Sequence, residues 1–505
     1  MILSTVQKTF ILLSCTFLGL ICGTLYLYSS YSPQLASQLQ YSATNASSIA
    51  LVGSLGVSVT GPIAGLVVDR KGYTTPLSIG GSGSTFINSV CLKCCAVTFP
   101  SLRGVATSLP LALYGLSAMF YSVIASMFFQ GDTSGFLRFL IGSSAVIFAV
   151  CSPLIMLCDR RNSIQSRTVR LAEPLEMANL RGLADLKTTS PIPVSLSSGP
   201  NELYGLGLLR SKQFWILFFI MGSMASLGQM YIYSVGYMVK ALVIRNFQLD
   251  PATAASSSVD MLIQNQQQLQ VGLLSMANCV GRLVAGVMGD IITQTFRKSR
   301  AWLLFVPAAG LICTQVMGSG ISVHEYLGVA SMLSGFFYGY TLCIMPTIVG
   351  DVFGMENFSG NWGIVGLAPV IPSFYLTNLF GEVYDSKSSA NESGVFACML
   401  GSQCYASVFK LSLAVSVVAL ILGYTSPKYQ VPPSNLFIPN FNFRYLVAYK
   451  YEHAGLMGGV ILDYDQLAVF NLGQGFPHNH SIYSLWRDLI PDIGTKNRDH
   501  RISHI

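Results

Sequence analysis

The sequence Gly61-Pro62-Ile63-Ala64-Gly65-Leu66-Val67-Val68-Asp69-Arg70-Lys71-Gly72 closes an apolar segment and turns abruptly into charge. Gly61 and Gly65 lie four residues apart, and small residues at this spacing let one membrane helix approach another closely. The charged residues that follow, with Gly72 after them, predict a tight turn, because glycine adopts backbone conformations that other residues resist. The stretch therefore predicts a helix that ends at a lipid surface.

The same pattern occurs again in the second half of the chain. The run Gly281-Arg282-Leu283-Val284-Ala285-Gly286-Val287-Met288-Gly289-Asp290 repeats the Gly-x-x-x-Asp ending, again at the close of an apolar segment. Basic residues follow this copy, among them Arg300. Two copies of one ending predict an architecture of two related halves.

The composition places the chain in a membrane. Of its 505 residues, 51% are hydrophobic and only 10% are charged, and the mean hydropathy is +0.53. Soluble proteins carry roughly a quarter charged residues, and apolar runs of about 20 residues suit membrane-spanning helices. We therefore predict an all-α polytopic membrane protein.

The net charge of +7 and the 12 cysteines have simple explanations. The basic residues lie mainly beside apolar segments, where the positive-inside rule expects them on the cytoplasmic side, so we expect no nucleic-acid partner. Cys91 and Cys94 form a Cys-x-x-Cys pair, a pattern that is also found in metal-binding and redox sites. Membrane spans also use cysteine as a small apolar residue, and no second pair lies near. We expect neither a metal nor a cofactor.

The apolar segments divide the chain into four regions. We predict an N-terminal helical bundle over 1–158, a cytoplasmic linker over 159–212, a C-terminal helical bundle over 213–425 and a polar tail over 426–505. Eleven spans are visible, near residues 9–30, 48–68, 77–97, 105–129, 136–157, 214–239, 269–291, 301–317, 326–349, 362–380 and 407–424.

The first half is shorter than the second. Asp290 lies 70 positions before Gly360, whereas Asp69 lies only 35 positions before Gly104 in the similar stretch of the first half. The difference of 35 positions is about the length of one helix with its loop. We therefore expect twelve spans in the complete pattern, with most of one span missing from the first half.

With these motifs the chain resembles a known family. Gly61–Gly72 is similar to the signature loop of the major facilitator superfamily, and Gly286 with Asp290 repeats it. Two further stretches are similar to the nodulin-like branch and to fungal monocarboxylate-transporter homologues, namely Leu25-Tyr26-Leu27-Tyr28-Ser29-Ser30-Tyr31-Ser32-Pro33 and Pro110-Leu111-Ala112-Leu113-Tyr114-Gly115-Leu116-Ser117. The likeness covers about residues 5 to 425 and excludes the tail.

The resemblance implies two bundles that rock about a central site, with signature loops that latch the cytoplasmic side. Asp69 would accept hydrogen bonds from free N–H groups at another helix's N-terminus, a contact that breaks when the gate opens. Arg70 and Arg282 would hold neighbouring carboxylates or carbonyls. The alternative is that these loops only obey the positive-inside rule. The expected gating residues are Gly61, Gly65, Asp69, Arg70, Gly72, Arg282, Gly286 and Asp290.

The resemblance also implies a substrate cavity near mid-membrane, between the halves. The polar candidates for its lining are Tyr26, Tyr28, Asn88, Lys93, Gln229, Tyr233, Asn278, Tyr338 and Tyr340. Tyrosines in spans are alternatively packing or interfacial residues, and Lys93 alternatively extends to the membrane surface. A cation in apolar sequence is costly and usually paired or functional, so Lys93 and Arg282 favour an anionic substrate.

The chain departs from the family at one position. Monocarboxylate porters carry an Asp four residues before the Arg of the eighth span, a pair on one helical face that is used in proton coupling. This chain has Asn278 before Arg282. Asparagine neither gains nor loses a proton, which argues against proton-coupled monocarboxylate transport.

We predict a secondary transporter of a small solute, an organic anion, that works by alternating access. We expect a monomer in the lipid bilayer of the vacuolar or plasma membrane. The alternative is a membrane sensor or regulatory protein that keeps the fold and moves nothing. An enzyme is not expected, because no nucleophile–base pair, phosphate-binding loop or metal cluster appears in or beside the spans.

Overall fold

The computed structural model describes residues 5–27, 43–80, 83–129, 135–159, 203, 205–246, 257–390 and 396–425. All of them belong to one compact unit, residues 1–437, and a second unit, 438–505, lies outside the described residues. Tyr28, most of the linker expected over 159–212 and the polar tail expected over 426–505 therefore also lie outside the described residues.

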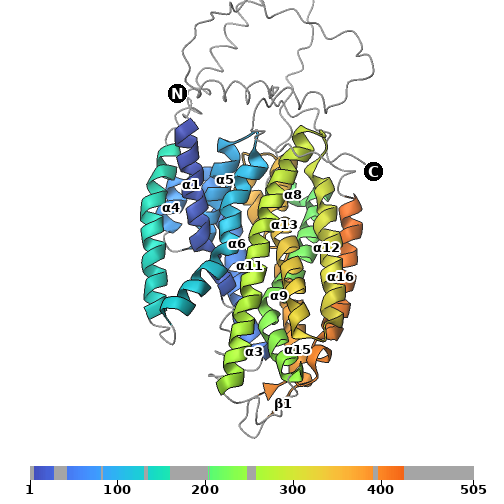
Figure 1. Cartoon of the computed structure of the whole chain (residues 1–505). Helices are drawn as coiled ribbons and strands as arrows, with labels where there is room; N and C mark the ends of the chain where they lie inside the picture. The colour runs from blue at the N-terminus through green and yellow to red at the C-terminus, as the bar shows by residue number, and fades with distance from the viewer. Residues whose placement is uncertain are drawn as a thin grey trace, which may run out of the picture. The chain divides into compact units, whose positions relative to one another are not determined.

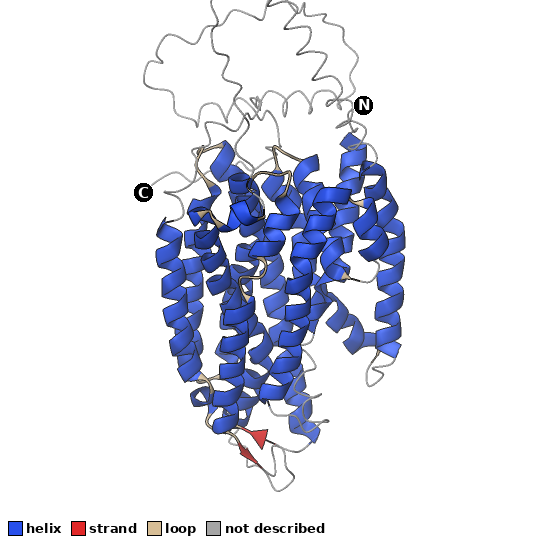
Figure 2. Ribbon diagram, turned by 180° about the vertical axis from the view of Figure 1, so that it is seen from behind, coloured by secondary structure: helices blue, strands red, loops and turns tan. Residues whose placement is uncertain are grey.

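Helices make up nearly all of the described chain (Figures 1 and 2). The first half contains α1 (Thr5–Cys22), η1 (Gly23–Leu27), α3 (Ala43–Lys71), α4 (Thr74–Gly80), α5 (Ser84–Thr98), α6 (Arg103–Phe128) and a helix over Gly135–Asp159. The second half contains α8 (Leu206–Leu209), α9 (Lys212–Asn246), α11 (Ser257–Gln294), η2 (Arg300–Leu304), α12 (Phe305–Gly320), η3 (His324–Tyr326), α13 (Leu327–Phe353), α14 (Phe358–Val365), α15 (Val370–Ser386), η4 (Gly401–Cys404) and α16 (Ala406–Thr425). A hairpin of two-residue strands, β1 (Ser389–Ala390) and β2 (Phe396–Ala397), precedes α16.

The predicted fold class is confirmed. Within the described part of the chain, ten helices are long and apolar enough to cross a membrane. Each of the six spans predicted in the second half corresponds to one of them, with α14 and α15 together forming a single span. Prolines lie inside α3, α6 and α13, which membrane helices tolerate because neighbouring groups satisfy the freed carbonyls. This is an integral, multi-pass membrane protein.

The region that follows Asp69 differs from the single span predicted over 77–97. It forms two short helices, α4 and α5, which pack against each other. Helix α5 has 15 residues, so it is about 22 Å long, shorter than the roughly 30 Å of a hydrocarbon core. The sequence from Gly80 to Gly83 is Gly-Gly-Ser-Gly, and glycine disfavours helix continuation. The apolar stretch is therefore divided in two.

This α4–α5 hairpin enters and leaves at one end of the helices, which we call the Asp69 end. Helix α4 begins three residues after α3 ends. On α5, Lys93 forms an ion pair with Asp69 near the end of α3, so α5 returns to the level at which α4 began. The hairpin therefore enters and leaves the membrane on one side, whereas the complete pattern of twelve spans would have two full crossings in this part of the chain.

The hairpin keeps both flanks of the central linker at the Asp69 end. Asp159, which ends the helix from Gly135, accepts hydrogen bonds from the backbone N–H and the hydroxyl of Thr74 at 3.1 and 2.9 Å. Beyond the linker, the carbonyl of Leu203 accepts a hydrogen bond of 2.9 Å from the side chain of Asn361 in α14. The charged segments that flank the linker therefore share one side.

Two sets of helices form the boundary between the halves. Helix α11 of the second half packs along α6 of the first half as well as along its own neighbour α13. On the other side, α14 and α15 of the second half pack against α3. Helices α3, α6, α11, α14 and α15 therefore form the largest part of this boundary.

Candidate functional site

Asp69 links the first half to the start of a helix in the second half. Its Oδ1 accepts the backbone N–H of Ser359 at 3.2 Å, and its Oδ2 accepts that of Gly360 at 2.6 Å. Both amides belong to the first turn of α14, where backbone N–H groups lack partners within the helix and the helix dipole favours negative charge. We call this contact the Asp69 cap. Its carboxylate side chain is 3% exposed.

Glycine makes the Asp69 cap possible. A Cβ atom added to Gly65, one helical turn before Asp69, would lie 2.1 Å from the carbonyl oxygen of Ser359. A Cβ atom added to Gly363 would likewise lie 2.6 Å from the backbone of Gly61. These contacts are with backbone atoms, which cannot move aside as a side chain can. Gly65 and Gly363 therefore set the distance between α3 and α14, whereas a Cβ atom on Gly61 itself would make an ordinary contact of 3.5 Å with the carbonyl oxygen of Gly363.

Asp290 makes the matching contact in the opposite direction. Its Oδ1 and Oδ2 accept the backbone N–H groups of Gly104 and Val105, each at 2.8 Å, at the start of α6. One turn earlier on α11, a Cβ atom added to Gly286 would lie 2.6 Å from the carbonyl oxygen of Gly104. We call this contact the Asp290 cap. Each half thus places a carboxylate on the N-terminus of a helix in the other half.

A cation accompanies each carboxylate. Lys93 lies with its Nζ atom 2.5 Å from Oδ1 of Asp69 and donates a hydrogen bond of 2.7 Å to the carbonyl of Glu356. Arg300 lies 2.9 Å from Oδ1 of Asp290 and also binds Asp351, which in turn pairs with Arg103 of the first half at 3.1 Å. The Asp290 cap is therefore part of a four-residue charge network.

The remaining residues of the first signature loop have different surroundings. Gly72 has φ of 75°, in the region that favours glycine, and a Cβ atom there would lie 2.5 Å from a carboxylate oxygen of Asp159. The side chain of Arg70 is exposed. Gly72 therefore shapes the turn into α4, whereas Arg70 lies outside the Asp69 cap.

A second cluster lies deeper, two turns before Asp290 on α11. Arg282 is 1% exposed and donates a 2.5 Å hydrogen bond to the carbonyl of Leu111 in α6. Its other terminal nitrogen lies 3.5 Å from the hydroxyl of Tyr26, and its guanidinium lies 5.2 Å from the centre of the Tyr114 ring. The Tyr26 hydroxyl in turn lies 3.2 Å from that of Tyr338. We call Arg282, Asn278, Tyr26, Tyr114 and Tyr338 the Arg282 cluster.

The Arg282 cluster contains buried polar atoms that have no partner. These are the Nε atom of Arg282 and both the nitrogen and the oxygen of the Asn278 amide. A Cβ atom added to Gly115 would lie 2.9 Å from Oδ1 of Asn278 and 3.5 Å from Nε of Arg282, so both groups border the same spot on α6. Of the ion pairs among the described residues, none includes Arg282. The cluster therefore presents an uncompensated positive charge with free hydrogen-bond donors.

The structure places the other cavity candidates in different locations. Tyr233 contacts Ser54 of α3 through their hydroxyls, so it faces the boundary between the halves. Gln229 accepts a hydrogen bond from Ser373 within the second half and lines a pocket together with residues of α3. Tyr340 lies two residues after Tyr338 on α13, on another face of that helix. Lys93 and Asn88 lie on α5, which places Lys93 in the Asp69 cap and not in the cavity expected for it.

The sequence did not predict several residues that bind Asp69, Asp290 and Arg282. Gly104, Val105, Ser359 and Gly360 contribute backbone amides, and Leu111 contributes a carbonyl, so their side chains give no sequence signal. Arg300 was visible only as a loop cation, and Asp351 and Arg103 as charges at helix ends. The available clue was the internal repeat, in which Gly104 of the first half corresponds to Gly360 of the second half. Arg300 also follows Asp290 closely in the sequence.

The fold and the two caps define a polytopic helical membrane protein whose two halves are joined reciprocally. The pattern of the Nodulin-like family matches residues 73–180. The chain is 24% identical to the uncharacterized membrane protein YMR155W of Saccharomyces cerevisiae, over 80% of this chain and 92% of that protein. It is also 24% identical to the probable transporter MCH1 of Wickerhamomyces anomalus, over 79% of this chain and 82% of the relative, and to that of Saccharomyces cerevisiae, over 79% and 88%. The predicted resemblance to the nodulin-like branch is confirmed.

Proposed function

We propose that this protein is a secondary transporter that moves a small organic anion across a membrane by alternating access. Relatives that match about four fifths of the chain are named probable transporters. The observation that carries the choice of an anion is Arg282, a buried guanidinium between the halves with a free Nε donor.

Arg282 suits a carboxylate. A guanidinium presents several N–H donors in a planar fork that matches the two oxygens of a carboxylate. Asn278 adds an unpartnered amide on the same helix, and the hydroxyls of Tyr26 and Tyr338 lie within the cluster. Burying a cation without a counter-ion is costly, so an anion that pairs with Arg282 removes that cost and gains affinity.

The two caps would act as the gate at the Asp69 end. Each cap joins a carboxylate of one half to a helix N-terminus of the other half, so any motion that separates the halves at this end must break both. Hydrogen bonds to charged groups contribute about 1.5–3 kcal/mol each, which is enough to bias the equilibrium while leaving it reversible. In this proposal the Asp69 end is the cytoplasmic one, since the basic linker flanks lie there.

A disulfide supports this orientation. Cys398 and Cys404 are bonded in the loop between α15 and α16. Gly401 of that loop packs on Arg245 near the end of α9, the end opposite to the linker. Disulfides persist in oxidising compartments, so this end would face the vacuolar lumen or the cell exterior. We accordingly propose a vacuolar or plasma-membrane location.

The test is uptake of radiolabelled lactate, citrate and benzoate by proteoliposomes that contain the full chain. Wild-type protein should accelerate uptake of at least one anion, Arg282→Gln should remove it, and Arg282→Lys should retain only part of it. Arg210→Gln, at an exposed arginine near α8, is the matched control and should transport normally. Binding of an anion without any flux would favour the sensor alternative and would overturn this proposal.

A further inference from the structure

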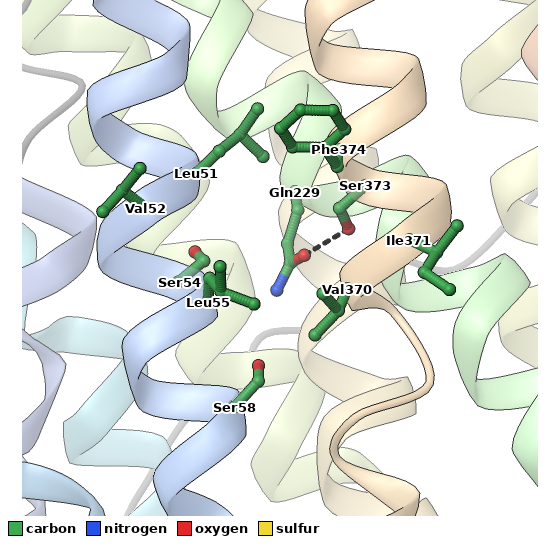
Figure 3. A pocket seen from close by; sticks show the side chains of 10 residues that line it. All are labelled: Leu51, Val52, Ser54, Leu55, Ser58, Gln229, Val370, Ile371, Ser373 and Phe374. Atoms are coloured by element: carbon green, nitrogen blue, oxygen red, sulfur yellow. Dashed lines mark hydrogen bonds between the residues drawn. The ribbon is translucent and has the colours of Figure 1, made fainter.

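A pocket lies between α3 of the first half and α15 of the second half (Figure 3). Its volume is about 170 Å³. Leu51 and Leu55 of α3 form one wall, Val370 and Phe374 of α15 form the opposite wall, and Gln229 of α9 lies at the back. The two walls therefore belong to different halves of the protein.

The pocket opens on the outer surface of the helices. Four of its lining side chains, those of Val52, Leu55, Ile371 and Phe374, are between 44% and 80% exposed. Both walls belong to segments that are long and apolar enough to cross a membrane, so this outer surface faces hydrocarbon and not water. A molecule can therefore reach the pocket directly from the bilayer.

On its inner side the pocket ends at contacts between side chains. Ser54 lines the pocket, and its hydroxyl contacts that of the buried Tyr233. The Oε1 atom of Gln229 accepts a hydrogen bond from the hydroxyl of Ser373, which also lines the pocket (Figure 3). These two pairs close the inner side, so the bilayer is the side from which the pocket fills.

The pocket lies in the part of the membrane that is farther from the Asp69 end. Ser58 and Leu51 precede Asp69 on α3 by 11 and 18 residues, which correspond to about 16 and 27 Å along the helix. The hydrocarbon core is roughly 30 Å thick, so the pocket extends from near the middle of the core to its far boundary. Acyl chains of the far leaflet occupy this depth.

We infer that the pocket between α3 and α15 binds an acyl chain of a phospholipid from this leaflet. An engineered apolar cavity of about 150 Å³ holds a benzene ring, so the pocket has room for about six carbon atoms of a chain. The lining residues include no charged side chain, so the pocket suits the chain, and the headgroup stays at the membrane surface. This binding requires only that the protein spans a membrane.

The bound chain favours one arrangement of the two halves. Both caps hold the halves together at the Asp69 end, whereas the pocket separates α3 from α15 farther along the boundary. In alternating access, halves that part at the Asp69 end approach each other at the other end. That motion narrows the pocket and expels the chain, so the chain stabilises the arrangement in which the caps are formed. This second step rests on the proposed function.

The test is photolabelling of the purified full chain, in detergent micelles, by a phosphatidylcholine that carries a diazirine in the middle of one acyl chain. Mass spectrometry quantifies the labelled peptides at increasing lipid concentration. Labelling of the pocket walls, residues 51–58 and 370–374, should saturate, whereas labelling of the exposed apolar face of α16 should rise linearly. A linear rise at the walls as well would overturn the inference.

Two variants fill the pocket from opposite walls. Ser58→Phe and Val370→Phe should each reduce the saturable labelling at least fivefold, and the second guards against misfolding of the first. Ile63→Phe, at an exposed position of α3 outside the pocket, is the matched control and should keep it. Saturable labelling that both filling variants leave unchanged would overturn the inference. Stronger competition by cholesterol than by unlabelled phosphatidylcholine would also overturn it, because a sterol hydroxyl would then bind the amide nitrogen of Gln229, which points toward the pocket (Figure 3).

The effect on the caps has a separate test. Asp69→Ala removes one cap and should reduce the saturable labelling at least twofold, whereas Glu382→Gln, at an exposed carboxylate on α15, should not. Unchanged labelling in Asp69→Ala would overturn the link to the caps and leave the lipid site intact. Saturable labelling of a protein that transports no anion would overturn the proposed function and leave the lipid site intact.

Discussion

The Nζ atom of Lys93 lies 2.5 Å from Oδ1 of Asp69, and this ion pair joins the re-entrant helix α5 to the end of α3. Both side chains are nearly buried, at 12% and 3% exposure. Lys93 also donates to the carbonyl of Glu356 just before α14, so one cation joins α5 to two other segments. The shortened region of the first half thus contributes directly to the contact between the halves.

The Asp69 and Lys93 substitutions should be strongly coupled. Asp69→Asn leaves Lys93 buried without its charge partner, and Lys93→Gln leaves Asp69 with the α14 amides alone, so each should lower the free energy of unfolding by about 3 kcal/mol. Groups in direct contact couple by about 0.5–3 kcal/mol, so the double variant should lose less than the sum of the two. Thermal or denaturant unfolding of the four proteins measures this. Glu382→Gln, at an exposed carboxylate on α15, is the control, and strict additivity would refute the coupling.

Gly65 and Gly286, which lie against backbone carbonyls of the other half, should tolerate no added methyl group. Gly65→Ala places its Cβ atom against the carbonyl of Ser359, and Gly286→Ala places its Cβ atom against that of Gly104, so each should destabilise the protein by about 1–3 kcal/mol. Gly56→Ala is the matched control on α3, because a Cβ atom there meets no other atom within 4 Å. It should leave the melting temperature unchanged or raise it slightly. Equal effects at Gly56 and Gly65 would show that helix propensity, and not the close approach, governs these positions.

Asn278→Asp should weaken anion binding. Asn278 and Arg282 lie one turn apart and border the same point beside Gly115, so a carboxylate at position 278 would pair with the guanidinium and compete with any external anion. We expect the affinity for benzoate, measured from the ligand-dependent shift in the thermal unfolding of the purified protein, to fall at least tenfold. Asn278→Leu, which has the same branched shape but brings no charge, should lose less. An unchanged affinity in Asn278→Asp would mean that anions do not bind at Arg282.

The Cys398–Cys404 disulfide should respond to reductant from one side only. In sealed vesicles a membrane-impermeant reductant should open it only when applied to the face opposite to the central linker, and mass spectrometry of alkylated protein would detect the two new thiols. Cys343, a buried thiol on α13, should remain unlabelled and serves as the control. Opening of the bond from the same face as a protease-accessible tag near Thr188 would reverse the proposed orientation.

Cys398→Ala should also lower stability. The bond closes a short loop between α15 and α16, with a sequence separation of six residues, and loss of such a bond costs about 2 kcal/mol, mainly through the entropy of the unfolded chain. The melting temperature of the purified protein measures this loss. Cys313→Ala, at an exposed free cysteine, should have no comparable effect. A melting temperature unaffected by Cys398→Ala would argue against the bond in the native protein.

The sequence by itself determined the all-α class and the six spans of the second half, because these depend on composition and on the length of apolar segments. It also indicated the resemblance to the nodulin-like branch, which rests on short local motifs. It also singled out Asp69 and Asp290, since a repeated Gly-x-x-x-Asp ending is a local pattern. Only the tertiary structure decided which groups these carboxylates bind, because their partners are backbone amides of distant helices, and a backbone amide has no side-chain signature.

The tertiary structure also decided the path of residues 74–98 and the role of Lys93. Apolar composition cannot distinguish one crossing from a hairpin that returns, because both bury similar residues, and the distinction depends on the long-range contact between Lys93 and Asp69. A pocket between α3 and α15 belongs to the same category, with Leu51 and Leu55 of α3 on one side and Val370 and Phe374 of α15 on the other (Figure 3). Its walls come from residues more than 300 positions apart, so their packing in three dimensions, and not any stretch of sequence, creates the space.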